Sequence, residues 1–256
     1  MREKKPVGAA TSIPLRCLFA AVLVVHAIAA VAAEVDFSGV WMPDDRAATQ
    51  WSVGSVPFTP RGAAEFRGFD PRKGDSVRYC MPFGTPRNTL STAPRPIEIL
   101  QRPEQITLLF DGMNDVRRIH LDGRAHPRDA LASWMGHSIG SWQGAVLRVD
   151  TVATNHESIL DESGLPHSDK ARITERLRVE IVRGRKTLID DILIDDPLYY
   201  REPLRATRQF VWAPAAAMSE GSSLCLLDQW RQRLEQLNKE LTDKKDSTVV
   251  SQERRQ

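Results

Sequence analysis

Residues 171–195 read ARITERLRVEIVRGRKTLIDDILID, and this stretch decides the fold. Before the central turn Arg183-Gly-Arg-Lys186, apolar side chains fall mainly on every second position. This alternation is typical of a strand with one face buried and the other in water. The run Thr187–Asp195 is again apolar-rich, so the two runs predict a β-hairpin. The apolar face of the first run carries Ile173, Leu177, Val179 and Ile181, and its polar face carries Arg172, Thr174, Arg176, Arg178 and Glu180.

Similar short runs precede and follow this hairpin, separated by turn signals. The pair Asp122-Gly123 predicts a hairpin, and Gln143-Gly144 is a second turn candidate. Successive β runs at short spacing indicate an antiparallel meander, which closes into a barrel or stacks as a sandwich. The other predicted strands are 37–42, 97–101, 105–111, 116–121, 138–142, 145–154 and 204–212.

Two charged residues depart from the alternation. Glu175 falls on the apolar face of its strand, and Arg208 shares a face with Leu204, Ala206, Phe210 and Trp212. A buried charge needs a partner. We expect both to point inward, where they pair with each other or line a polar cavity; the alternative is a strand end that leaves both in water.

The remaining segments differ from the β region. Residues 1–33 have a basic start, an apolar run and a small-residue end, which predicts a secretory signal peptide and a periplasmic or secreted protein. That run is too short to favour a permanent membrane span. Within the predicted barrel domain 34–216, residues 34–96 are Pro-rich and predict a loop-rich wrap. Residues 217–245 predict an amphipathic α-helix, and 246–256 a disordered tail.

Charge and cysteine content narrow the classes of partner. Without residues 1–33 the chain has 31 basic and 32 acidic residues, which argues against nucleic-acid binding. Cys80 and Cys225 are the cysteines that remain. An exported chain favours a disulfide between them, with two separate buried thiols as the alternative.

Five of the six histidines lie between His120 and His167. Imidazole titrates near neutral pH and ligates metals, so this enrichment predicts a site. No pair has the spacing of a known metal motif, so metal and cofactor content stay unknown. An inward Glu175 beside a histidine suits acid–base chemistry, with Asp122, Asp150 and Asp161 as other carboxylates in reach. Ser138 in Gly136-His-Ser-Ile-Gly140 lacks the strand-to-helix setting that the nucleophile-elbow motif requires, which argues against a serine hydrolase.

Gly39-Val-Trp41 on the first strand, with Arg208 on the last, resembles the lipocalin (calycin) pattern. The resemblance implies a mainly β, lipocalin-like barrel in which the antiparallel meander closes on itself. The chain departs from that pattern in its long Pro-rich insertion after the first strand.

A second resemblance covers residues 80–200 and points to a group of uncharacterised exported bacterial proteins. It is carried by the stretches Cys80–Arg87, Asp122-Gly-Arg-Ala-His-Pro127, Ser133-Trp-Met-Gly-His-Ser-Ile-Gly140, Trp142-Gln-Gly144, Val149-Asp-Thr151, Pro166-His-Ser168 and Glu175-Arg176. It implies that His126, His137, His167 and Glu175 occupy motif positions, whereas His120 and His156 do not.

Three functions remain open. The first is binding of a small, mostly apolar or aromatic molecule at a His- and Glu-lined site, with Arg118, Arg124, Trp134, Trp142 and Arg208 as ligand-binding candidates. The second is an enzyme that uses His126, His137, His167 and Glu175 in acid–base or metal-assisted chemistry. The third is an envelope interaction protein that uses its C-terminal helix, through which a weak dimer is also an option.

Overall fold

The computed structural model of the protein describes residues 35–44, 51, 53–91, 95–113, 115–218, 228, 230–239 and 242. The predicted signal peptide and C-terminal tail lie outside these residues, and so does Cys225. The predicted Cys80–Cys225 disulfide therefore stays a prediction.

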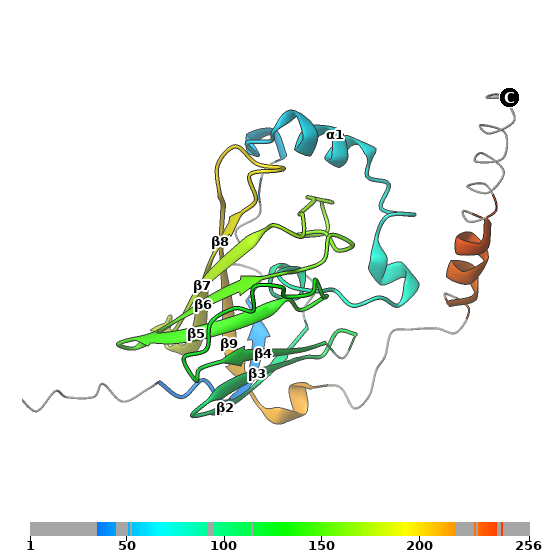
Figure 1. The fold of residues 1–256 in the computed structure, drawn as a ribbon. Helices are drawn as coiled ribbons and strands as arrows, with labels where there is room; N and C mark the ends of the chain where they lie inside the picture. The colour runs from blue at the N-terminus through cyan, green and yellow to red at the C-terminus, as the bar shows by residue number, and fades with distance from the viewer. Residues whose placement is uncertain are drawn as a thin grey trace, which may run out of the picture. The chain divides into compact units, whose positions relative to one another are not determined.

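Nine strands form a closed barrel in chain order (Figure 1). The first strand pairs with both the second and the ninth, which closes the sheet. The prediction of a mainly β, lipocalin-like barrel is thus confirmed. The strands are β1 (Gly39–Pro43), β2 (Ile97–Arg102), β3 (Gln105–Phe110), β4 (Val116–His120), β5 (His137–Gln143), β6 (Val146–Val152), β7 (Arg172–Val182), β8 (Arg185–Asp195) and β9 (Leu204–Ala213).

One junction differs from the predicted antiparallel meander. β4 and β5 pair in parallel, at Ile119–Ser138 and His120–Ile139, whereas every other neighbouring pair is antiparallel. The predicted hairpin at Asp122-Gly123 is therefore wrong. A parallel pair needs a long crossover, and the chain between the two strands provides it. The Asp122 side chain accepts from Arg124 N at 3.2 Å and makes only a local bend.

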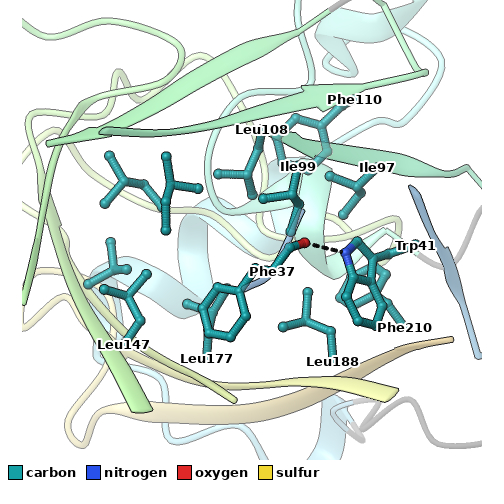
Figure 2. Close-up of a cluster of buried hydrophobic side chains, with 13 residues drawn as sticks. Phe37, Trp41, Ile97, Ile99, Leu108, Phe110, Leu147, Leu177, Leu188 and Phe210 are labelled. Atoms are coloured by element: carbon teal, nitrogen blue, oxygen red, sulfur yellow. Dashed lines mark hydrogen bonds between the residues drawn. The ribbon is translucent and has the colours of Figure 1, made fainter. Parts of the chain in front are cut away.

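The barrel interior is filled in three layers. One apolar layer surrounds Phe37 and Trp41, and the Trp41 indole donates to Phe37 O at 2.8 Å (Figure 2). A second apolar layer contains Ile173, Ile192 and Ala206. Between them lies a ring that we call the polar layer, formed by the buried side chains Arg117, Ser138, Thr151, Glu175, Asp190 and Arg208.

Strand alternation explains the polar layer. Along β7, Ile173 belongs to the second apolar layer, Glu175 to the polar layer and Leu177 to the first apolar layer. Glu175 and Arg208 are each 1% exposed, so their predicted inward orientation is confirmed. Ile181 has the same parity but is 72% exposed, because it sits next to the β7–β8 turn.

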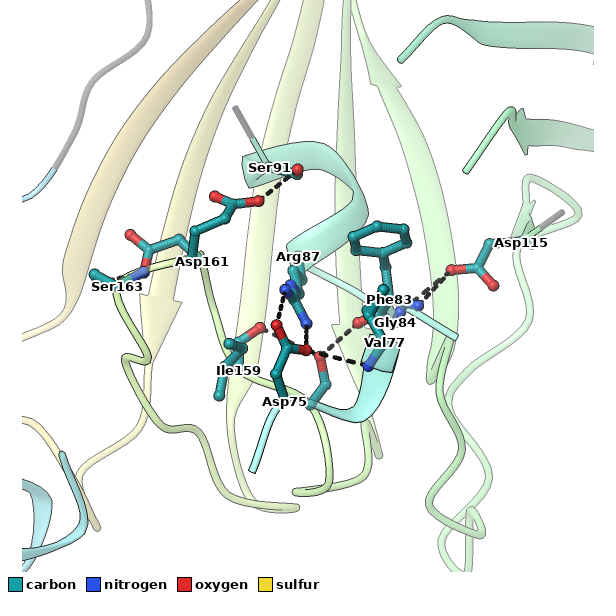
Figure 3. Close-up of polar contacts among 12 residues, drawn as sticks. Asp75, Val77, Phe83, Gly84, Arg87, Ser91, Asp115, Ile159, Asp161 and Ser163 are labelled. Atoms are coloured by element: carbon teal, nitrogen blue, oxygen red, sulfur yellow. Dashed lines mark hydrogen bonds and ion pairs between the residues drawn. The ribbon is translucent and has the colours of Figure 1, made fainter. Parts of the chain in front are cut away.

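The described part of the Pro-rich segment contains short helices between its loops. They are η2 (Val53–Ser55), α1 (Pro60–Gly68), η3 (Ser76–Tyr79) and α2 (Arg87–Leu90). Asp75 caps η3 by accepting from Val77 N and binds both terminal nitrogens of the buried Arg87, at 2.6 and 2.9 Å (Figure 3). This bidentate pair fixes η3 against α2.

After β9 come η4 (Ala215–Ala217) and a helical segment over 230–239. Trp230 is 40% exposed and Leu234 is 53% exposed. The apolar stripe predicted for this helix is thus about half exposed at these two positions, and the dimer stays a prediction. Within the described residues, no helix has both the length and the apolar character that a membrane crossing requires.

Candidate functional site

A groove of about 410 Å³ opens on the outer face of the barrel where β4 and β5 part. The two strands pair only near Ile119 and His120, so their other ends diverge. We call this hollow the β4–β5 groove. Its lining is Val116, Arg118, His120, Ser133, Trp134, Met135, Gly136, His137 and Ser138.

The loop before α2 supports one wall of the groove. Thr85 N donates to Trp134 O at 2.8 Å, and the Met135 sulfur accepts from Asn88 Nδ2 at 3.6 Å. Gly84 has a φ of +76°, and a Cβ there would lie 2.9 Å from Trp134 O. Only glycine allows this approach without strain.

Asp115 ties the same loop to the start of β4. Its Oδ2 accepts from Phe83 N at 3.0 Å and from Gly84 N at 3.3 Å (Figure 3). Burial raises the pKa of Asp115 to about 6, although the two backbone donors act in the opposite direction. The groove wall is therefore held by hydrogen bonds rather than by packing alone.

Three histidines gather at the groove. His126 Nδ1 and His137 Nδ1 lie 2.8 Å apart, a hydrogen-bond distance. The His120 ring lies over the His137 ring, with centroids 5.5 Å apart and planes at 30°. His120 and His137 line the groove, while His126 lies behind His137 in the crossover loop.

A carboxylate stands behind the histidine pair. Asp150 Oδ2 lies 4.0 Å from His126 Nε2, and the Asp150 side chain is 11% exposed. Arg172 forms an ion pair with the same carboxylate oxygen. Two buried atoms here, His126 Nε2 and Asp150 Oδ1, have no hydrogen-bond partner among the described residues.

Burial favours the neutral form of all three imidazoles. Desolvation is the first cause that lowers the pKa of His120, His126 and His137. The charge of Arg124 lowers the pKa of His137 further, whereas the charge of Asp150 partly offsets the effect at His126. The site is thus set up to hold neutral histidines near pH 7.

Glu175 does not join the histidines. It lies inside the barrel, opposite Val149, while Asp150 and His137 have the outward parity of the same sheet. Arg117 Nη1 donates to Glu175 Oε1 at 2.8 Å, and Arg117 Nε donates to Ser138 Oγ at 3.1 Å. The expected clustering of Glu175 with His126 and His137 is therefore wrong.

Asp190 completes this buried network. Desolvation and the neighbouring Glu175 charge raise the pKa of Asp190 well above its usual value, and its Oδ1 is buried without a partner among the described residues. Arg208 lies opposite Asp190 in the register and donates to Ser91 O at 2.8 Å. We expected Glu175 and Arg208 to pair with each other or to line a polar cavity. Glu175 instead pairs with Arg117, and both side chains lie in the buried polar layer.

His167 lies apart from the histidine pair. It is 1% exposed, and its Nδ1 lies 3.4 Å from Ser168 O. Burial lowers the pKa of His167 to about 4. Its neighbour Ser168 is bound by Asp196, through the backbone N at 2.6 Å and Oγ at 3.0 Å. This arrangement anchors the loop before β7.

The predicted ligand-binding residues divide into two groups. Arg118 and Trp134 line the groove, and the exposed Arg124 stands nearby, paired with Asp122. Trp142 lies at an inner position of β5, 5.3 Å from the Phe37 ring, and Arg208 belongs to the polar layer. Trp142 and Arg208 are thus inside the barrel rather than at the groove.

Sequence reasoning gave too little weight to several residues. His120 lies outside the motif positions, yet it lines the groove with Arg118, and their shared parity on β4 is the signal that would have found it. Asp150 was one of three alternative carboxylates. Arg117 and Asp190 were not singled out. Among the described residues, no group of three or more His, Cys, Asp or Glu side chains is arranged to hold a metal ion.

Comparison with models of known protein families and with curated proteins found no match for this chain. The function therefore has to be argued from the geometry of the groove.

Proposed function

We propose that the protein binds a small molecule in the β4–β5 groove, and that this molecule combines an aromatic or apolar body with an acidic group. The supporting observation is the composition of the groove, where Trp134 and Met135 stand beside Arg118 and two imidazoles. Pockets for small molecules are mostly apolar with a few polar groups that fix orientation. The bound molecule thus differs from a purely apolar ligand.

The filled barrel favours this external site over a central one. Apolar side chains occupy the inner positions at both ends of the strands, and the polar layer separates them. Eight or nine strands enclose an interior that side chains can fill by themselves. A ligand on the outer face needs no rearrangement of this core.

Export is part of the proposal. The basic and apolar start of the chain supports a periplasmic or secreted location. A small-molecule site in that compartment would meet compounds that enter the envelope from outside.

Calorimetric titration with 1-naphthoate and with its methyl ester tests the ligand class. The wild type should bind the carboxylate about tenfold more tightly than the ester, because Arg118 interacts with the negative charge. Arg118→Gln should remove this difference, and Trp134→Ala should weaken the binding of both compounds.

Two matched variants serve as controls. Arg148→Gln removes an exposed arginine from the outer face of β6, and Trp212→Ala removes a half-exposed tryptophan that lines a different hollow. Both should bind like the wild type. Wild-type protein that binds neither compound, or groove variants that bind as well as the controls, would overturn the proposal.

A further inference from the structure

The contact between His126 and His137 fixes how many protons the pair can hold. Their Nδ1 atoms lie 2.8 Å apart, so one must carry a hydrogen and the other must accept it. Two bare nitrogens would repel each other, and two N–H groups would clash. A neutral pair therefore has two arrangements, which differ in the histidine that donates.

Asp150 selects between these arrangements. If His126 donates from Nδ1, its Nε2 is bare and faces a carboxylate 4.0 Å away, which places two acceptors together. If His137 donates, His126 carries its hydrogen on Nε2 and points it toward Asp150. The second arrangement turns an N–H toward the carboxylate, at a His126 Nε2 that is otherwise buried without a hydrogen-bond partner among the described residues.

The chosen arrangement leaves His137 with a bare Nε2. His137 lines the groove, and its Nε2 has no hydrogen-bond partner among the described residues. A lone pair at the edge of a binding groove is the feature of a general base. His126 and Asp150 act behind it as positioning residues, in the way that a carboxylate orients the histidine of a catalytic triad.

The surrounding charges are consistent with this role. Arg172 forms an ion pair with Asp150, and Arg118 lines the groove where an anion would lie. Burial lowers the pKa of both histidines of the pair, which keeps His137 neutral near pH 7. The charged and titratable groups around the pair are His120, Arg118, Arg124, Asp122, Asp150 and Arg172.

We infer that His137 accepts a proton from a weakly acidic O–H group, such as a phenol or an enol, of a molecule bound in the β4–β5 groove, and that His126 and Asp150 hold it in the tautomer that can do so. This inference rests on the proposed function. It names the acidic group of the ligand and gives the site a chemical step.

The step balances as a simple proton transfer. The ligand O–H bond breaks, its electron pair stays on oxygen, and an N–H bond forms at His137 Nε2. The positive charge spreads through the Nδ1 hydrogen bond toward Asp150, and Arg118 faces the new oxyanion. No electron changes hands, and no co-reactant is required.

Nitrogen-15 NMR of histidine-labelled protein tests the tautomer. We expect hydrogen on His137 Nδ1 and His126 Nε2 in the wild type. Asp150→Asn should shift the pair toward the opposite arrangement, because the amide N–H can donate to a bare His126 Nε2. Asp191→Asn, which removes a 40%-exposed carboxylate of β8 that pairs with Arg178, should leave the pattern unchanged. Hydrogen on His137 Nε2 in the wild type, or no response to Asp150→Asn, would refute the positioning role.

The chromogenic probe p-nitrophenol tests the transfer itself, because only its phenolate absorbs in the visible. Below the pKa of the free probe, binding should raise the phenolate fraction. His137→Gln should bind the probe but lower this fraction to what the charge of Arg118 alone supports, and Asp150→Asn should lower the phenolate-to-phenol ratio about tenfold.

The outcomes distinguish the proton transfer to His137 from ligand binding in the groove. A probe that binds yet stays a phenol, or a phenolate fraction that His137→Gln leaves unchanged, overturns the proton transfer and leaves the groove as a binding site. A probe that does not bind, as measured by calorimetry and by histidine chemical shifts, counts against the proposed function as well.

Discussion

Arg117 is a full positive charge at 1% exposure, and Glu175 is the carboxylate that neutralises it. Removing one member of such a pair leaves the other charge buried without compensation. Ser138 and Thr151 accept further hydrogen bonds from the guanidinium, so hydrogen bonds as well as charge hold the pair. This network makes Glu175 a structural residue of the barrel.

Glu175→Gln should therefore destabilise the protein by about 3–5 kcal/mol, because Arg117 loses its counter-charge. Urea denaturation followed by tryptophan fluorescence measures the change. Glu180→Gln, at an exposed acid of the same strand, should change stability by less than about 1 kcal/mol. Equal effects of the two variants would show that Glu175 is not the buried counter-ion.

His167 gives the stability of the fold a defined pH dependence. Its pKa is about 4 in the folded protein against an ordinary value of 6.5 for histidine, so the unfolded chain takes up the proton first. Stability is full above pH 6.5 and falls as the pH drops toward 4, by about 3 kcal/mol in total. His167→Gln should flatten this decline in denaturation curves recorded across that range.

Asp115 should act in the opposite direction. Its pKa is raised to about 6, so the folded protein binds this proton more tightly than the unfolded chain does. Its contribution therefore increases stability as the pH falls below 6. Asp115→Asn should make the acid decline steeper, whereas His167→Gln makes it shallower. Shifts of the same sign in both variants would contradict these two assignments.

Some of this residue-scale picture was readable in the sequence. Alternation placed Glu175 and Arg208 inside because their strand neighbours are apolar. Alternation also assigns Arg117 to the inner face, because it shares its parity with the buried Ile119. With Arg118 and His120 on the opposite face, however, this short strand carries polar side chains on both faces, and its buried face is hard to recognise. The contact between His126 and Asp150 joins a loop to a strand, and no local pattern encodes it.

At the scale of elements, α1 shows how a helix is fixed to the barrel by one close approach. Thr59 caps the helix by accepting from Gly62 N at 3.0 Å, and its hydroxyl donates to Leu198 O at 2.8 Å. Gly62 lies so near the chain at Tyr199 that a Cβ would be 2.1 Å from Tyr199 O. Phe58 and Phe66 stack beside this contact.

Gly62→Ala should push α1 away from Tyr199 and destabilise the protein by about 1–3 kcal/mol, because backbone cannot yield as a side chain can. Thermal unfolding by circular dichroism measures the loss. Gly68→Ala, at the other end of the same helix, meets no atom within 4 Å and should be neutral or slightly stabilising. A neutral Gly62→Ala would mean that α1 is not seated as described.

Elements were predictable where the signal is local. The β7–β8 hairpin follows from alternation and a central turn, whereas α1 lies in the Pro-rich segment 34–96, for which we predicted a loop-rich wrap. The parallel pairing of β4 and β5 was not predictable, because the turn residues Asp122-Gly123 specify a bend but not which strand pairs next. Which strands become neighbours depends on burying both apolar layers, and this is a property of the whole chain.

For the whole molecule, the parallel junction has a mechanical consequence. A closed ring of strands yields first at its weakest join, and β4 meets β5 at two positions while β7 and β8 pair along their full length. Local opening there breaks few strand pairings and needs less free energy than global unfolding. Hydrogen–deuterium exchange should be faster at Ile119, His120 and Ile139 than at Leu177 and Ile189.

The short β4–β5 pairing lies beside the β4–β5 groove. A ligand bound in this groove would contact both strands and hold them together. Exchange at the β4–β5 pairing should then slow on addition of 1-naphthoate, while exchange in β7 and β8 stays constant. If exchange slowed equally in all strands, or did not slow between β4 and β5 at a saturating ligand concentration, the bound ligand would not be holding these two strands together. Ligand binding would thus stabilise the barrel at the neighbouring strands that share the fewest paired positions.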